Sequence, residues 1–115
     1  MEVQNIMIGL WIDDIREPPP QFTYKNINVK WTQAKSVKEA QYYIQYMESI
    51  NCPYNIISAD HDAGDYAKYG GDYIKLLDWL EATGRSYPIH IHSMNPVGVQ
   101  NMRAIIQKNN WKEVK

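Results

Sequence analysis

Residues with carboxylate and imidazole side chains lie at or just after the ends of three short apolar runs in this sequence. The clusters are Asp13-Asp14 after the run 6–12, Asp60-His61-Asp62 shortly after the run 54–57, and His92-Ser93 at the end of the run 88–93. Short apolar runs that contain β-branched residues predict buried strands. Because open α/β sheets place ligands beyond the carboxyl ends of their strands, we expect one polar site if these strands are parallel neighbours.

The aspartates of these clusters predict a divalent metal site, formed by Asp13, Asp14, Asp60 and Asp62. Like charges this close destabilise one another by several kcal/mol unless a cation offsets them or one carboxylate stays protonated. All-oxygen ligands favour Mg²⁺, and a histidine ligand would shift the preference towards Mn²⁺. The alternative is that the aspartates cap helices and face solvent at loop ends. Two acidic clusters at two strand ends favour the metal.

His61 and His92 are the side chains of the expected site whose proton affinity lies near neutral pH. A metal that activates water, with a histidine that donates a proton to a leaving alkoxide, would hydrolyse a phosphoester. We therefore predict His61, His92 and Asp60 as catalytic residues, with Asp60 also a metal ligand. The alternative for a single histidine is a core residue bonded to a carbonyl. This interpretation is adopted for His90, which lies further inside its strand.

The turn 93–98 is the predicted phosphate-binding element. A helix that begins directly after a strand presents free backbone N–H groups, and Gly98 would let an anion approach closely. Ser93 could add a hydroxyl donor, and Asn95 is the expected N-cap of the helix. Arg16 is a candidate clamp for two phosphate oxygens. The alternatives are a simple strand-to-helix turn and a surface arginine.

The composition indicates one globular domain over residues 1–115. Of the 115 residues, 44% are hydrophobic and 22% are charged, with a net charge of -1; these values are ordinary for a globular domain. The charge balance excludes a long basic surface for nucleic acid and gives no attraction to a membrane. The single cysteine, Cys52, excludes an internal disulfide and favours the cytoplasm. No apolar run is long enough to predict a membrane span.

Strand and helix patterns alternate in the order of a flavodoxin-like, receiver-like α/β fold. Predicted strands cover 6–12, 28–32, 54–57, 89–93 and a short last strand or tail at 111–114. Right-handed crossovers through three later helices give a three-layer fold with a parallel sheet of order 2-1-3-4(-5) and helices on both faces. The proline run 18–20 reduces the first helix to a loop, since proline removes an amide donor and clashes with the preceding turn.

Capping signals place the ends of the three helices. They are a capping box of Ser36 and Glu39 with an end near Asn51, Asp72 as N-cap with an end at Gly84, and Asn95-Pro96 at the start of the last helix. The second strand, 28–32, shows only partial alternation, so we expect it to be short and near an edge.

Longer strings within these motifs resemble one family of receiver domains. The strings are residues 10–18, 60–64 and 92–98, followed by Asn101-Met102. They resemble the cyclic-phosphate processing receiver domain family, a divergent branch of the response-regulator receivers. The resemblance implies that Asp13, Asp14 and Asp60 bind the metal. It implies a cyclic phosphate of a nucleotide or an RNA end as substrate. It also implies that four residues are additions that distinguish this family: His61, Asp62, His92 and Ser93.

The chain departs from ordinary receivers in its proline run and in having no secure counterpart of the lysine after their fifth strand. This departure argues against standard phosphosignalling. The lead hypothesis is a metal-dependent phosphoesterase that opens a cyclic phosphodiester. The alternatives are a non-catalytic signalling module, phosphorylated on Asp60 and read by a partner protein, and a module that binds a nucleotide without turnover.

Overall fold

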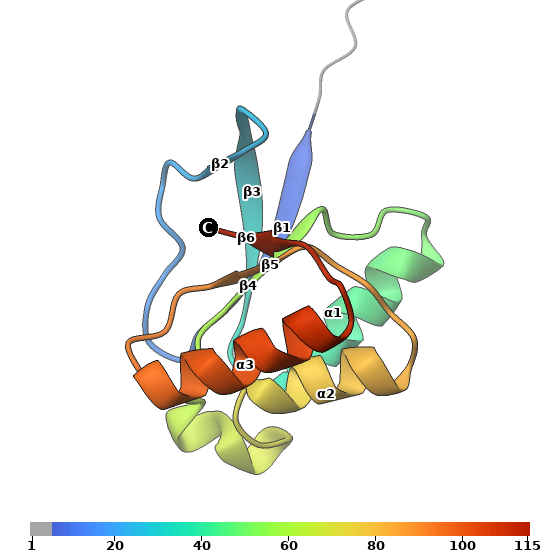
Figure 1. Cartoon of the computed structure of the whole chain (residues 1–115). Helices are drawn as coiled ribbons and strands as arrows, with labels where there is room; N and C mark the ends of the chain where they lie inside the picture. Colours follow the sequence, from blue (N-terminus) through green and yellow to red (C-terminus); the bar gives the residue numbers. More distant parts are fainter. Residues whose placement is uncertain (1–5) are drawn as a thin grey trace, which may run out of the picture.

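Six strands and three α-helices alternate along the computed structural model, which describes residues 6–115 (Figure 1). The elements are β1 Met7–Ile12, β2 Thr23–Tyr24, β3 Ile27–Ala34, α1 Val37–Ser49, β4 Ile56–Ala59, the short 3-10 helix η1 Gly64–Tyr69, α2 Ile74–Ala82, β5 Ile89–Ile91, α3 Pro96–Lys108 and β6 Glu113–Val114. The predicted domain 1–115 includes residues 1–5, which lie outside the described part of the chain.

The strands form one curled sheet in the order β2-β3-β1-β4-β5-β6. Every neighbouring pair from β3 to β6 is parallel. Apart from the added strand β2, this is the predicted order 2-1-3-4-5, so the receiver-like fold is confirmed. Ile12 of β1 is level with Ala34 of β3 and with Ala59 of β4. The carboxyl ends of the three central strands therefore reach the same edge of the sheet.

All three α-helices cover one face of the sheet, whereas the sequence predicted helices on both faces (Figure 1). From β3 to β4, β5 and β6 the chain crosses the sheet in one direction, and right-handed crossovers then place successive helices on the same face. The connection from β1 to β3 runs in the opposite direction and so belongs to the second face. It contains the proline run 18–20 and forms no helix.

Aromatic side chains cover the second face of the sheet in place of a helix. Phe22, at the end of the proline-rich connection, packs edge-on against Trp31 and His90, with ring centroids 5.2 and 5.1 Å apart. Trp31 packs in the same way against Trp11 at 5.5 Å. These contacts hold the connection 13–22 over the strands although it has no regular structure.

The second predicted strand is longer than expected. We expected a short strand at 28–32, but β3 has 8 residues and is the longest strand of the described chain. A tight turn at Lys25 and Asn26, both with positive φ of 53° and 62°, joins it to β2 in an antiparallel hairpin. Such a turn matches the twist of paired strands. The hairpin moves the edge of the sheet from β3 to β2.

The predicted helix ends are confirmed with one exception. The Ser36 hydroxyl accepts from the Glu39 amide, and the Asn95 side chain accepts from the Gly98 amide, so both act as N-caps. Asp72 was predicted as the N-cap of α2, and that prediction is wrong because the cap position is Tyr73. The Asp72 carboxylate instead accepts from the backbone N–H of Ala63 at 3.0 Å. It ties the loop after β4 to the start of α2.

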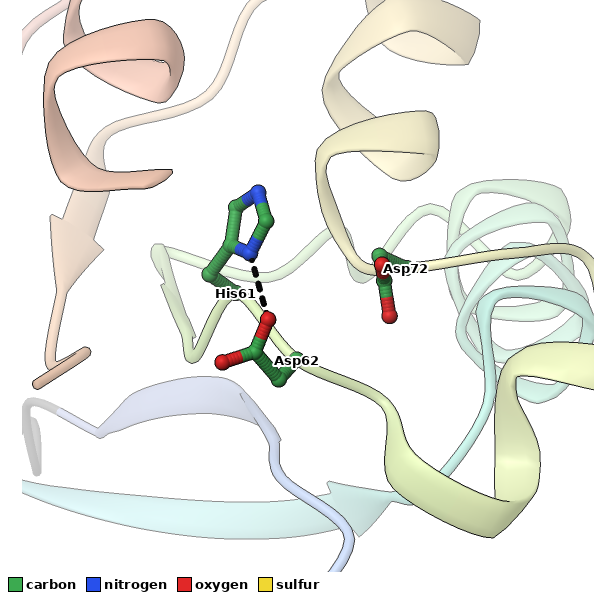
Figure 2. Close-up of side chains that lie close together, drawn as sticks. All are labelled: His61, Asp62 and Asp72. Carbon is green, nitrogen blue, oxygen red and sulfur yellow. Dashed lines mark hydrogen bonds and ion pairs between the residues drawn. The ribbon is translucent and has the colours of Figure 1, made fainter. Parts of the chain in front are cut away.

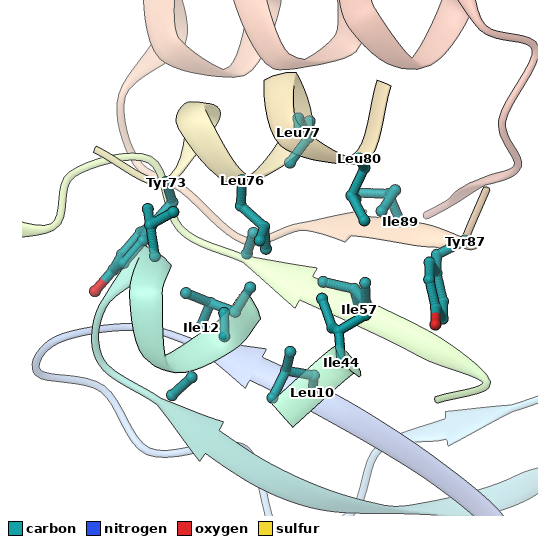
Figure 3. Close-up of a cluster of buried hydrophobic side chains, with 14 of the residues drawn as sticks. Leu10, Ile12, Ile44, Ile57, Tyr73, Leu76, Leu77, Leu80, Tyr87 and Ile89 are labelled. Carbon is teal, nitrogen blue, oxygen red and sulfur yellow. The ribbon is translucent and has the colours of Figure 1, made fainter. Parts of the chain in front are cut away.

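The hydrophobic core lies between the sheet and the three helices (Figure 3). Alternate residues of the central strands, such as Leu10, Ile12 and Ile57, point towards α2, where Leu76 and Leu77 are also fully buried. Figure 3 also shows Ile44 of α1 in this layer. Burial of such side chains stabilises the fold by about 1.5–3 kcal/mol each. Between residues 6 and 115, no helix is both long and apolar enough to cross a membrane.

Candidate functional site

Three of the predicted metal ligands converge at the carboxyl ends of β1 and β4. Asp13, Asp14 and Asp60 each place one carboxylate oxygen within 4.8 Å of the others. Asp13 and Asp60 follow paired strands directly, and the Asp60 amide donates to the carbonyl of Ile12 at 3.0 Å. The sheet register therefore brings together residues 47 positions apart in the sequence, as Asp13 and Asp60 are.

Asp13 is the most constrained acid of this cluster, with only 1% of its surface exposed. Its Oδ1 accepts from the amides of Ile15 and Arg16, each at 2.9 Å. Its Oδ2 accepts from Arg16 Nε at 3.2 Å and lies 3.0 Å from His92 Nε2. Burial opposes the charged form, yet the amides of Ile15 and Arg16 and the contact with His92 hold the pKa of Asp13 below its ordinary value. Asp13 is therefore ionised at neutral pH.

Asp14 lies in the same cluster with a different balance of charge. Burial, together with the negative charges of Asp13 and Asp60, raises the pKa of Asp14 above its ordinary value. The backbone of Gly64, with φ of +55°, passes beside it, and a Cβ at Gly64 would lie only 2.4 Å from Asp14 Oδ2. Glycine at this position lets the loop after β4 close over Asp14. An unoffset negative charge of this kind suits a bound cation.

Arg16 supplies the positive charge that contacts this cluster in the described chain. Its guanidinium lies 3.2 Å from Asp13 and 3.4 Å from Asp60, and 45% of its side chain is exposed. The sequence predicted Arg16 as a clamp for phosphate, and the structure places it at the site. It holds the acidic residues themselves, and its exposed position leaves it free to turn towards solvent.

His92 joins β5 to the acidic cluster, but both of its ring nitrogens already have partners. Nε2 lies 3.0 Å from Asp13 Oδ2 and Nδ1 lies 2.8 Å from the hydroxyl of Ser58. The ring stacks on Trp11, with centroids 3.8 Å apart and an interplanar angle of 5°. Burial lowers the pKa of His92 to about 4 despite the nearby Asp13 carboxylate. At neutral pH His92 is therefore a neutral donor to Asp13.

His61 is more accessible and lies in a second group of polar side chains (Figure 2). Its Nδ1 lies 2.8 Å from Asp62 Oδ1, and the two side chains point towards each other while Asp72 lies across the loop. Asp62 was predicted among the metal ligands of the first cluster, but the structure groups it with His61 and Asp72 instead. Its side chain is 63% exposed. The reason is the turn after Asp60, which carries Asp62 away from the edge of the sheet.

The turn after β5 is closed by its own side chains. Ser93 Oγ accepts from the amide of Asn95, and Asn95 Oδ1 accepts from the amide of Gly98, both at 3.0 Å. Two of the amides predicted to face a phosphate are therefore already bonded. Gly98 admits the ring of His61 rather than an anion, because a Cβ there would lie 2.4 Å from His61 Cγ. The turn thus positions His61 at the start of α3.

Two residues that the sequence analysis did not select hold the loop after β1 in place. Trp11 Nε1 donates to the carbonyl of Arg16 at 2.9 Å, and Gln33 Nε2 donates to the carbonyls of Asp13 and Arg16. Gln33 lies at the carboxyl end of β3, level with Trp11. These two strands were predicted to be neighbours, so Gln33 could have been expected beside the end of β1. It was missed because the prediction ended the second strand at residue 32.

A separate hollow of about 450 Å³ lies at the opposite end of the sheet, next to the amino ends of β4 and β5. Its charged side chains satisfy one another: Arg85 Nε donates to both oxygens of Glu48, and the Tyr87 hydroxyl donates to Glu48 as well. The hollow therefore offers no free charged group for a ligand. The convergent polar groups of the molecule lie instead at the carboxyl ends of the strands, where α/β folds bind ligands.

Comparison with protein families identifies the family of this chain. The family model of the cyclic-phosphate processing receiver domain matches residues 8–108, which includes both polar clusters. Searches of curated proteins and of solved structures found no significant match. The matched range spans most of the chain and every strand except the last. The chain therefore belongs to the cyclic-phosphate processing receiver domain family.

Proposed function

We propose that this domain is a metal-dependent phosphoesterase that opens a cyclic phosphodiester. The observation that carries the proposal is the convergence of Asp13, Asp14 and Asp60 at one edge of the sheet, where His92 contacts Asp13 and His61 follows Asp60 directly. In the reaction, the oxygen of water bonds to phosphorus and one ring P–O bond breaks. The water gives up a proton, the leaving alkoxide takes one, and the net change is addition of one water.

The donor set of the acidic cluster fits a hard divalent cation such as Mg²⁺ or Mn²⁺. Asp14 and Asp60 would hold the ion, and Asp13 would complete the set once Arg16 leaves its carboxylate, since four contacts already occupy the Asp13 oxygens. When bound, the ion would polarise the phosphoryl oxygens and lower the pKa of bound water. The displaced Arg16 would then pair with phosphate oxygens, so one side chain serves both states.

His61 fits the role of general acid or base better than His92. Its Nδ1 is held by Asp62, and its Nε2 has no hydrogen-bond partner within residues 6–115. A carboxylate at Nδ1 fixes the tautomer and leaves Nε2 as the reactive atom. His92 has both nitrogens bonded and is neutral at pH 7. We assign it the orientation of Asp13 rather than proton transfer to substrate.

Exposed apolar side chains beside the acidic cluster support an organic phosphate as substrate. Ile15, Met94 and Val97 are 82%, 86% and 67% exposed. Ile15 and Met94 lie in the loops after β1 and β5, and Val97 lies in the first turn of α3. Asp13 and His92 are in contact, and Ile15 and Met94 lie two residues after Asp13 and His92, respectively. Such surface suits the base and sugar of a nucleotide or of an RNA end more than inorganic phosphate. We propose the cytoplasm as the location, from the single exposed Cys52.

The experiment is hydrolysis of a panel of 2′,3′-cyclic and 3′,5′-cyclic nucleotides, with Mg²⁺, with Mn²⁺ and with chelator. We expect metal-dependent ring opening that Asp60→Asn abolishes, because the substitution removes a charged ligand. Asp78→Asn is the matched control, since Asp78 is a half-exposed acid on α2 that pairs with Lys75 on the same helix. It should retain wild-type turnover.

A different result would redirect the assignment. Labelling of Asp60 by a small phosphate donor, with no turnover of any cyclic nucleotide, would favour the signalling module that the receiver fold also allows. Binding of a nucleotide without cleavage in either metal would favour a binding module. Turnover that persists in chelator would contradict the metal dependence.

A further inference from the structure

Ser58 lies between two histidines in the middle of the sheet, and the proposed reaction uses neither Ser58 nor His90. Ser58 is fully buried in β4 and is level with His90 of β5. Its Oγ lies 2.7 Å from His90 Nδ1 and 2.8 Å from His92 Nδ1. With Asp13 beyond His92 Nε2 at 3.0 Å, four polar side chains form one continuous chain of contacts. This chain crosses β5, β4 and β1 on the face without helices.

The number of available protons limits the directions of the hydrogen bonds in this chain of contacts. A serine hydroxyl donates one hydrogen bond, and a neutral imidazole carries one N–H and one lone pair. Both contacts of Ser58 go to Nδ1 atoms, so the hydroxyl can donate to only one of them. The other Nδ1 must carry a hydrogen and donate to Ser58. The two neutral rings are therefore required to be opposite tautomers.

The Asp13 end of the chain decides which ring has which tautomer. Asp13 accepts from the amides of Ile15 and Arg16 and from the Arg16 side chain, so its carboxylate acts as an acceptor throughout. His92 must then present Nε2–H to Asp13, which leaves its Nδ1 as a lone pair. Ser58 donates to that lone pair, and His90 donates to Ser58 through Nδ1–H. The order is His90 to Ser58 to His92 to Asp13.

We propose that Ser58 and His90 are positioning residues that fix the tautomer of His92 and thereby hold Asp13 for the metal. The surrounding rings keep this order in place: His92 is stacked on Trp11, and Phe22 packs edge-on against His90. The part that concerns metal affinity rests on the proposed function. The order of the hydrogen bonds does not rest on it, because it follows from the contacts of Ser58, His90, His92 and Asp13.

The first test is long-range ¹H–¹⁵N NMR of the histidine rings in the full chain, without metal and at neutral pH. We expect a protonated, pyrrole-type Nε2 and a pyridine-type Nδ1 for His92. For His90 we expect the reverse, with Nδ1 protonated. The opposite assignment at either ring would overturn the proposal. No variant is needed for this measurement, so a variant that fails to fold cannot leave the question open.

The second test measures Mn²⁺ binding to three variants. Ser58→Ala breaks the chain, and His90→Leu removes its first donor, whereas His90→Asn keeps an amide N–H near the position of Nδ1. Partners that orient a metal ligand typically change metal affinity 10- to 100-fold. We expect at least about a tenfold weaker affinity for Ser58→Ala and for His90→Leu. His90→Asn should restore most of the affinity.

The outcomes separate this proposal from the proposed function. Wild-type tautomers in the expected order, in a protein that hydrolyses no cyclic nucleotide, would retain the hydrogen-bond order and reject the phosphoesterase. Equal Mn²⁺ affinity in the wild type, Ser58→Ala and His90→Leu would reject the positioning role. Equal loss in His90→Leu and His90→Asn would reject it too, since it would point to packing rather than to the donor.

Discussion

The two faces of the sheet use the same strands for different purposes. In β4, Ile57 points into the core below the helices, while the next residue, Ser58, joins the chain of hydrogen bonds on the other face. In β5, Ile89 belongs to the core and His90 to the opposite face. Side chains alternate between faces along a strand. The central strands β1, β4 and β5 are therefore apolar on the helix face, and their other face combines aromatic rings with polar groups.

The difference shows how a thin layer can protect a polar network. On the helix face, burial of apolar side chains stabilises the packing. On the second face, the rings of Trp11 and Phe22 cover two histidines, and the hydrogen bonds of those histidines require a defined order. Hydrogen bonding there is less complete, because Trp31 Nε1 is buried without a hydrogen-bond partner in the described part of the chain. Polar order on this face is maintained by few contacts, so it should be sensitive to small changes.

The largest effect on stability is expected from neighbouring substitutions on the two faces, Ile57→Ala and Ser58→Ala. Ile57→Ala should lower the free energy of unfolding by about 2–5 kcal/mol, because it leaves a cavity in the core. Ser58→Ala should cost about 1–3 kcal/mol, because it leaves the Nδ1 lone pair of His92 and the Nδ1–H of His90 without a partner. Urea unfolding gives both values. The reverse order would contradict the assignment of stability to the helix face.

The second face should also determine how stability depends on pH. Burial holds the pKa of His92 at about 4, below its ordinary value of 6.5, so the unfolded chain binds the extra proton between these two pH values. Stability contributed by neutral His92 is present above pH 6.5 and is lost as pH falls towards 4. The slope for one such group approaches about 1.4 kcal/mol per pH unit.

Urea unfolding at a series of pH values measures this slope. His92→Phe keeps a ring stacked on Trp11 but removes the titrating group. Its stability should vary less between pH 4 and pH 6.5 than that of the wild type. Parallel profiles for the two proteins would show that His92 is not the group responsible.

A smaller effect, confined to activity, is expected from Gly98→Ala. The new Cβ would lie 2.4 Å from His61 Cγ, so the imidazole must move. Alanine favours a helix over glycine by about 1 kcal/mol, and this gain should offset the cost of moving the ring. We therefore expect the free energy of unfolding to change little. Turnover of a cyclic nucleotide should fall at least about tenfold if His61 transfers the proton. Unchanged turnover with a displaced ring in the crystal structure would remove His61 from the mechanism.

The smallest effect on stability is expected at the exposed rim. Met94→Ser should change the free energy of unfolding by less than about 0.5 kcal/mol, because 86% of the side chain is exposed. It should raise KM for a cyclic nucleotide while kcat stays the same. Ile50→Ser, at an exposed apolar residue after α1, is the matched control and should leave KM unchanged. An equal KM for both variants would show that the rim does not contact substrate.

Much of the fold could be predicted because its signals are local. The apolar runs, the Ser36 and Asn95 caps and the proline run determine where most strands and helices begin and end. The exceptions depend on distant contacts. Asp72 has the right residue type for an N-cap, but Ala63 offers its carboxylate an amide donor nine residues earlier. The hairpin at Lys25 and Asn26 has no glycine, so it lacks the residue that most clearly predicts such a turn.

The candidate site was predictable in part for the same reason. Strand ends are readable from sequence, and parallel neighbours bring their ends together, so Asp13, Asp14 and Asp60 could be grouped before the structure was known. Asp62 is separated from them by the direction of a loop, which no local pattern specifies. The pairing of His90 and Ser58 depends on the register of β4 and β5.

The sequence by itself determined the order of the strands and the residue types gathered at their carboxyl ends, because hydrophobic period and capping are properties of neighbouring residues. Only the tertiary structure decided the state of each group. It placed the helices on one face, turned Asp62 away from the other acids, and bonded both nitrogens of His92. Burial and hydrogen bonding depend on residues brought close by folding, and they set whether a side chain binds, orients or transfers a proton.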